Sequence, residues 1–139
     1  MIESSFQGDI REVPISVLAY IGDAVYELTV RLHLCSQSSA KSGALHRRSV
    51  QLVRATAQAE AARKLLPVLT EEELSIFRRG RNSQPGSMPR NADPADYLIA
   101  TGFEALIGYL YLKGDKCRLD DLLAEILKEQ KNGKEVQQA

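Results

Sequence analysis

Glu104 is an acidic residue in an otherwise apolar segment, GFEALIGYLYL. The nearest charged residues along the chain are Asp96 on one side and Lys113 on the other. Burying an unpaired carboxylate costs several kcal/mol. Glu104 must therefore pair with a basic residue, stay protonated or bind a cation.

Asp23 raises the same question in the segment AYIGDAVYEL, where it lies between Gly22 and Ala24. A glycine inside a helix costs about 1 kcal/mol relative to alanine, so Gly22 indicates a requirement other than helix stability. Small side chains at these two positions would let another helix approach closely. We therefore consider that Asp23 and Glu104 project from two packed helices into one cleft.

Two carboxylates in one cleft suit a hard cation such as Mg²⁺, which keeps several waters when only one or two carboxylates bind it. Such a cation can turn a bound water into a nucleophile and stabilise charge on a phosphoryl oxygen. If phosphates are held nearby, this chemistry would be phosphodiester hydrolysis. The residues alone leave open a structural alternative, in which each carboxylate pairs with a basic residue or faces solvent.

One basic stretch offers contacts for phosphates. No acidic residue occurs between Leu74 and Ala92, whereas the arginines there are Arg78, Arg79, Arg81 and Arg90. Because the net charge of the chain is zero, anion contacts are expected to be concentrated in this stretch. A solvated surface loop is the alternative interpretation.

Helical periodicity dominates the chain and predicts one all-α domain of about five to seven helices. The expected helices run from Pro14 to about Leu34, from about Leu45 to Pro67 as one long element, from Thr70 to Arg79, from Asp93 to about Lys113, and from Leu119 to Leu127. The fourth is apolar almost all round, which predicts the central buried element. No strand-like alternation, internal repeat or second domain is recognisable.

Local signals mark several helix ends. Thr70 and Glu73 have the spacing of a capping box, and Asp93 before a proline is typical of a helix start. Gly80 and Gly114 are expected to stop the helices that precede them. Between the third and fourth helices, RGRNSQPGSMPRN contains two glycines and two prolines, which predicts a loop.

Composition limits the class of protein. The chain has 139 residues, of which 44% are hydrophobic and 26% charged, as is usual for a globular domain. We divide it into a lead-in (1–13), a folded domain (14–128) and a polar tail (129–139) that is expected to fray. With no membrane-length apolar run and no secretion signal at the N-terminus, we expect a cytoplasmic protein without membrane contact. Cys35 and Cys117 do not form a zinc or disulfide pattern and are interpreted as ordinary thiols.

The motifs around the two carboxylates are similar to those of a known family. LAYIGDAVYEL resembles the signature helix of the ribonuclease III family, and FEALIGYLYL resembles its second acidic segment. The RRGRNS run and the expected lack of a C-terminal double-stranded-RNA-binding domain resemble the family's short form, Mini-ribonuclease III. The resemblance covers roughly Pro14 to Leu127.

This resemblance implies a ribonuclease III-type endonuclease domain over 14–128 that cuts double-stranded RNA with Mg²⁺. It also implies a homodimer with one catalytic site per subunit. The implied substrate is the double-stranded terminal stem of the 23S ribosomal RNA precursor. A ribosomal protein that assists cleavage is a possible further partner.

Carried over by position, Asp23 matches the aspartate of the GDA motif and Glu104 matches the glutamate of the FEALIG motif, both metal ligands in the family. Three further acidic positions of the full-length enzymes are occupied here by Ser16, Ala19 and Thr101. Less negative charge is then available to gather two cations. We therefore expect one well-held Mg²⁺ per site with more water ligands.

Duplex RNA presents phosphates and 2′-hydroxyls rather than readable base edges, so the four arginines become expected phosphate contacts. His46, beside two arginines, is interpreted as part of a polar helix face. The tyrosines are expected in the core or at a dimer interface, namely Tyr20, Tyr26, Tyr97, Tyr109 and Tyr111. Two alternatives remain: a non-catalytic double-stranded-RNA-binding or ribosome-assembly module on the same fold, and a helical interaction domain in which the two carboxylates form structural ion pairs.

Overall fold

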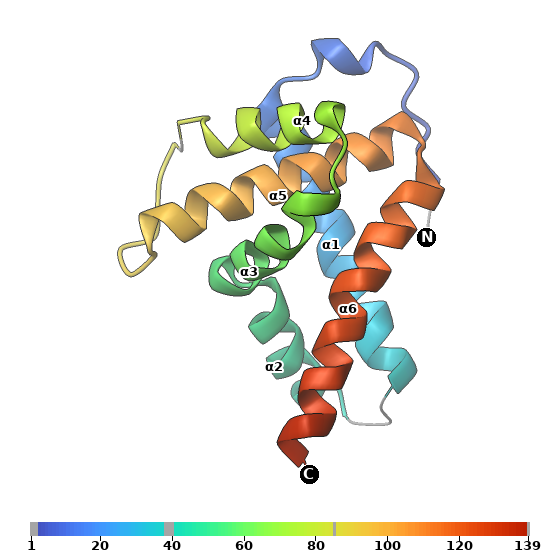
Figure 1. The fold of residues 1–139 in the computed structure, drawn as a ribbon, viewed down its shortest axis with the longest axis vertical. Coiled ribbons are helices and arrows are strands. Elements are labelled where there is room, and N and C mark those ends of the chain that lie inside the picture. Colours follow the sequence, from blue (N-terminus) through green and yellow to red (C-terminus); the bar gives the residue numbers. More distant parts are fainter. Residues whose placement is uncertain (1–2, 38–40, 85, 139) are drawn as a thin grey trace.

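The structure, a computed structural model, describes residues 3–37, 41–84 and 86–138, with side chains to residue 128. Within these residues the fold has six α-helices, two short 3₁₀ helices and no strand (Figure 1), which confirms the predicted all-α class. The helices are η1 (Ile10–Glu12), α1 (Ile15–Gln37), α2 (Ser42–Val53), α3 (Ala55–Leu65), η2 (Leu66–Val68), α4 (Glu71–Arg81), α5 (Pro94–Lys113) and α6 (Lys116–Gln138). In this part of the chain no helix combines the length and apolarity that a membrane span requires.

Helix α5 is the central element, as its apolar sequence predicts. It packs against α1, α3 and α4, and it crosses the middle of the fold in Figure 1. The Asp93 carboxylate caps its first turn by accepting from the backbone N–H groups of Ala95 and Asp96. Gly114 ends it with a left-handed φ of 82°, a conformation that costs glycine little. Both predicted ends of this helix are therefore confirmed.

The predicted long helix from about Leu45 to Pro67 is wrong, because the structure divides it into α2 and α3. The break lies at Arg54, whose backbone is extended (φ −66°, ψ 156°). The Gln58 side chain donates to the Val53 carbonyl at 2.7 Å and thereby provides a donor to the end of α2. The change of direction lets α2 pack against α1 while α3 packs against α5.

The prediction that Gly80 stops α4 is also wrong. Gly80 lies inside the helix, and a β-carbon at this position would come within 2.8 Å of the Gly102 Cα and 2.9 Å of the Ala105 side chain. The glycine therefore serves the close approach of α4 to α5. At the other end of α4 the predicted capping box is confirmed, since Thr70 and Glu73 each accept from the other's backbone N–H.

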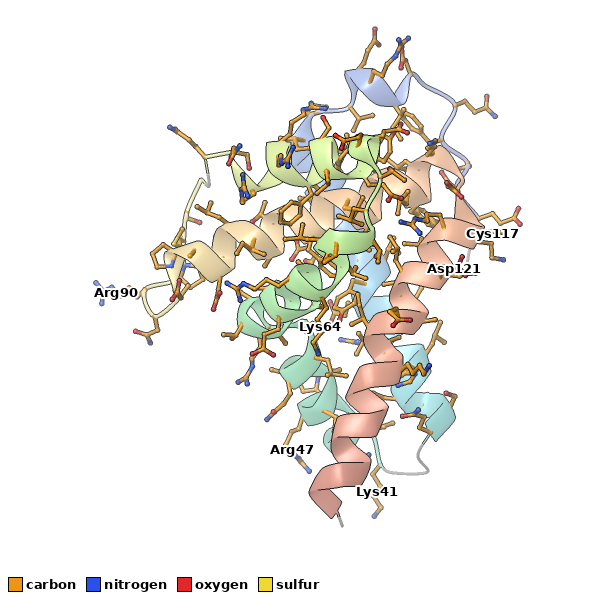
Figure 2. The ribbon with its side chains drawn as sticks, viewed as in Figure 1. Lys41, Arg47, Lys64, Arg90, Cys117 and Asp121 are labelled. Atoms are coloured by element: carbon orange, nitrogen blue, oxygen red, sulfur yellow. The ribbon has the colours of Figure 1, made fainter. Side chains whose placement is uncertain are left out.

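Two helices, α1 and α6, extend further than the sequence predicts. Helix α1 continues to Gln37, beyond its expected end near Leu34. Helix α6 begins at Lys116 and continues to Gln138, so the backbone of the segment that was expected to fray is helical. Cys35 and Cys117 are exposed free thiols, and Figure 2 shows Cys117 near the start of α6.

Candidate functional site

The two sequence-predicted carboxylates lie at the crossing of α1 and α5. A β-carbon added to Gly22 of α1 would come within 1.7 Å of the Glu104 carbonyl oxygen, and one added to Gly108 of α5 within 1.9 Å of the Leu18 carbonyl oxygen. The helix backbones are therefore in direct contact, and only glycine fits at either position. This confirms the interpretation of Gly22. Ala24 is exposed and takes no part in the contact.

The charge of Asp23 acts on Glu104. Burial is the main cause that raises the pKa of Glu104 to about 8, and the negative charge of Asp23 raises it further. The pKa of Asp23 is raised by partial burial of its carboxyl group and by the charge of Glu27. In the described part of the chain neither Asp23 nor Glu104 forms an ion pair with a basic residue. Without a cation, Glu104 is therefore mostly protonated at neutral pH instead of being neutralised by a basic residue, which counts against the structural ion-pair alternative.

Glu27 is an acidic neighbour that the sequence reasoning missed. It lies one helical turn after Asp23 and pairs with Arg31 through an N–O distance of 2.6 Å. The i, i+4 spacing from Asp23 is visible in the sequence and places both carboxylates on one face of α1. The ion pair with Arg31 offsets part of the Glu27 charge, and the charge of Glu27 still raises the pKa of Asp23.

Gln58 is the second residue that the sequence reasoning missed. Its side chain is only 2% exposed, and its amide hydrogen-bonds the Glu104 carboxyl group, which partly offsets the rise in the pKa of Glu104. Its Oε1 atom is buried and has no hydrogen-bond partner among the described residues. An alanine-rich stretch with one glutamine provides no obvious signal for this role.

The positions at which full-length family members carry further acids contribute no carboxylate. Ser16 is exposed, Ala19 is buried, and the Thr101 hydroxyl donates to the Tyr97 carbonyl at 3.0 Å. Over the residues that the structure describes, no group of three or more His, Cys, Asp or Glu side chains is placed to hold a metal. The site therefore offers two carboxyl groups. These hard oxygen donors, which have no basic partner, fit a divalent cation such as Mg²⁺, whose charge would favour the ionised form of Glu104.

The four predicted arginines do not form one compact cluster. Arg78 and Arg79 are exposed on the last turns of α4, and Arg90 extends from the loop before α5 away from the rest of the fold (Figure 2). Arg81 is half-buried, with its guanidinium 5.8 Å from the centre of the Phe77 ring. In the described residues none of the four is ion-paired, so their charges are available to an anionic ligand.

Comparison with known proteins links this geometry to one family. Residues 16–115 match the family model described as Ribonuclease III domain. A Symbiobacterium thermophilum protein named Mini-ribonuclease 3 is 48% identical over 111 residues, which span 80% of this chain and 85% of the relative. A Mini-ribonuclease 3 of Brevibacillus brevis is 47% identical over 109 residues, spanning 78% and 81%. The crystal structure of a Fusobacterium nucleatum protein matches with a TM-score of 0.80 at 28% identity and covers 89% of this chain and 99% of that one.

Proposed function

The chain belongs to the ribonuclease III family and is an endoribonuclease specific for double-stranded RNA, and we propose that Asp23 and Glu104 bind the Mg²⁺ on which its cleavage depends. The family is generally dependent on a divalent metal. The observation that carries the proposal is the pair of carboxyl groups at the α1–α5 crossing: the charge of Asp23 raises the pKa of Glu104, and neither group has a basic partner in the described chain. Membership of the family, predicted from the two motifs, is confirmed.

The residues of the proposed site have distinct roles. When bound, the cation supplies Lewis acidity, which stabilises charge on a phosphoryl oxygen and makes water a stronger nucleophile. Asp23, on the exposed side, and Glu104, deeper in the crossing, provide ligands from two helices whose separation is fixed by Gly22 and Gly108. Because Ser16, Ala19 and Thr101 add no carboxylate, one Mg²⁺ per site is the proposed occupancy.

A cleavage assay tests this proposal. The protein is incubated with a fully paired RNA stem in Mg²⁺ and, separately, in Ca²⁺, and the assay is repeated with Asp23→Asn and Glu104→Gln. We expect cutting only in Mg²⁺ and loss of cutting in both variants, with RNA binding retained. If either variant cuts the RNA as the wild type does, the residue replaced in that variant is not a ligand of the catalytic cation. RNA binding without any cutting by the wild-type protein would favour the non-catalytic module.

Arg78, Arg79, Arg81 and Arg90 are proposed to hold RNA phosphates. Their support is chemical: exposed or half-exposed guanidinium groups without carboxylate partners suit the phosphates of a duplex, which is recognised by its shape and backbone. Because Arg90 lies on a loop away from α4, the four would contact more than one phosphate position along the duplex. Binding through them should weaken steeply as salt increases.

We also propose that the enzyme is a homodimer that pairs through one face of α1. Exposed apolar side chains recur along this helix with the spacing of a single stripe, namely Val17, Tyr20, Leu28 and Leu32. Tyr20 is 76% exposed, an unusual position for a large aromatic residue that has no partner surface. Asp23 lies one turn further along α1, so a partner packed on this stripe would border the site of each subunit.

The natural substrate is proposed to be the terminal stem of the 23S ribosomal RNA precursor, which implies a cytoplasmic enzyme. The support is the similarity over most of the chain to proteins named Mini-ribonuclease 3. Cleavage of that stem should be faster than cleavage of an equally long, fully paired stem of shuffled sequence. Equal rates would contradict the choice of substrate. A rate increase when ribosomal proteins are bound to the precursor would identify a helper.

A further inference from the structure

Gln58 joins the break between α2 and α3 to the carboxylate site. Its Nε2 atom carries two hydrogens. One is donated to the Val53 carbonyl at 2.7 Å, and the amide also hydrogen-bonds the Glu104 carboxyl group. A carbonyl accepts and does not donate, so the nitrogen rather than the oxygen of the amide must face Val53. The orientation of the amide is therefore determined by its surroundings.

This arrangement leaves Oε1 without a donor. A buried polar atom without a hydrogen bond costs about 1–3 kcal/mol, and Gln58 is 2% exposed with Oε1 unpaired among the described residues. A leucine or methionine would fill a similar volume without this cost. An apolar side chain would avoid this cost but would lose the donor to the Val53 carbonyl, so packing of α3 against α5 does not by itself require the amide.

We propose that Gln58 is a positioning residue of the metal site, whose amide links the end of α2 to Glu104 and holds that carboxylate where, together with Asp23, it binds the cation. The inference rests on the proposed metal site. The amide restrains the carboxylate, and the unpaired Oε1 is the cost of holding the amide in this orientation. With only two carboxylates at the site, the orientation of each has a large effect on affinity, and loss of a residue that orients a ligand typically weakens metal binding about 10- to 100-fold.

The test measures metal binding directly and does not depend on cleavage. Mn²⁺ is titrated into the metal-free protein and the free ion is followed by electron paramagnetic resonance, for the wild type, Gln58→Met and the control Gln51→Leu. Methionine keeps the length of the side chain but has no amide, and Gln51 is exposed on α2. We expect Gln58→Met to bind Mn²⁺ at least about 10-fold more weakly and to regain cleavage at high Mg²⁺. The control should bind as the wild type does.

Several outcomes would overturn the inference. If Gln58→Met binds Mn²⁺ like the wild type, the amide does not position Glu104. If its cleavage is lost but is not restored by high Mg²⁺, the defect lies elsewhere than in metal binding. Should Gln58→Met fail to fold, Gln58→Leu takes its place under the same criteria. A wild-type protein that binds no Mn²⁺ overturns the metal site itself, a result distinct from equal binding by wild type and variant.

Discussion

Replacing Glu104 by glutamine should stabilise the metal-free protein, by an amount that grows with pH. The pKa of the Glu104 carboxyl group is about 8 in the folded chain against an ordinary value of 4.5. Below the ordinary value the group is protonated in both states, so its charge has no effect on stability. As pH rises towards the folded value, the unfolded chain releases the proton and the folded chain retains it, which favours unfolding.

The size of this effect follows from the difference between the two pKa values. Each pKa unit corresponds to about 1.4 kcal/mol, so the full effect is at most about 5 kcal/mol near pH 8. Glu104 is half-buried and its surroundings can relax, so we expect a gain of about 2–5 kcal/mol for Glu104→Gln at pH 8 and almost none near pH 4. Glutamine has nearly the same shape and no charge to bury.

Urea denaturation followed by circular dichroism, in a chelator and at several pH values, measures the effect. Glu60→Gln is the matched control, because Glu60 is exposed on α3; it should change the free energy of unfolding little at any pH. Adding Mg²⁺ should reduce the difference in free energy of unfolding between Glu104→Gln and wild type, because the ion stabilises only the folded wild type. A gap between Glu104→Gln and wild type that is absent, or that does not change with pH, would refute the electrostatic reasoning.

Three further predictions concern the helix crossing, the dimer and the RNA contacts. Gly22→Ala forces a β-carbon to within 1.7 Å of a backbone oxygen and should lower the free energy of unfolding by about 3 kcal/mol or more. The control Gly43→Ala, whose β-carbon would lie 3.7 Å from its nearest neighbour, should change the free energy of unfolding by less than about 1 kcal/mol. Equal effects of the two variants would contradict the close contact of α1 and α5. Tyr20→Glu should convert dimers to monomers in sedimentation equilibrium while Val68→Glu, at another exposed apolar position, should not, and a dimeric Tyr20→Glu would exclude this face. Arg90→Ala should reduce the slope of log affinity for duplex RNA against log salt by about one, and an unchanged slope would remove Arg90 from the interface.

The proximity of Asp23 and Glu104 could be predicted because each acid lies in a sequence context that does not favour it. An acid in an apolar segment and a glycine inside a helix are each unfavourable for local structure, which indicates a role in tertiary structure or function. The family motifs then identified the two segments as partners. The contribution of Gly108 could not be predicted in the same way, because a glycine in an apolar helix does not indicate which neighbour approaches it.

Gln58 could not be found because its position depends on a break that the sequence does not mark. Arg54 carries no glycine or proline signal, so the periodicity from Leu45 onward was continued through it as a single helix. The break restarts the helical phase and turns Gln58 into the core. Gly80 illustrates the same limit, since a glycine near a predicted end fits both a stop signal and a tertiary contact.

The central claim is that Asp23 and Glu104 together bind the catalytic cation, and the most direct measurement is a crystal structure of the protein soaked with Mn²⁺. The anomalous difference map should show one peak at the α1–α5 crossing, about 2.0–2.3 Å from a carboxylate oxygen of Asp23 and from one of Glu104, with waters completing the shell. A fully occupied Mn²⁺ elsewhere, with no peak at this crossing, would contradict the claim.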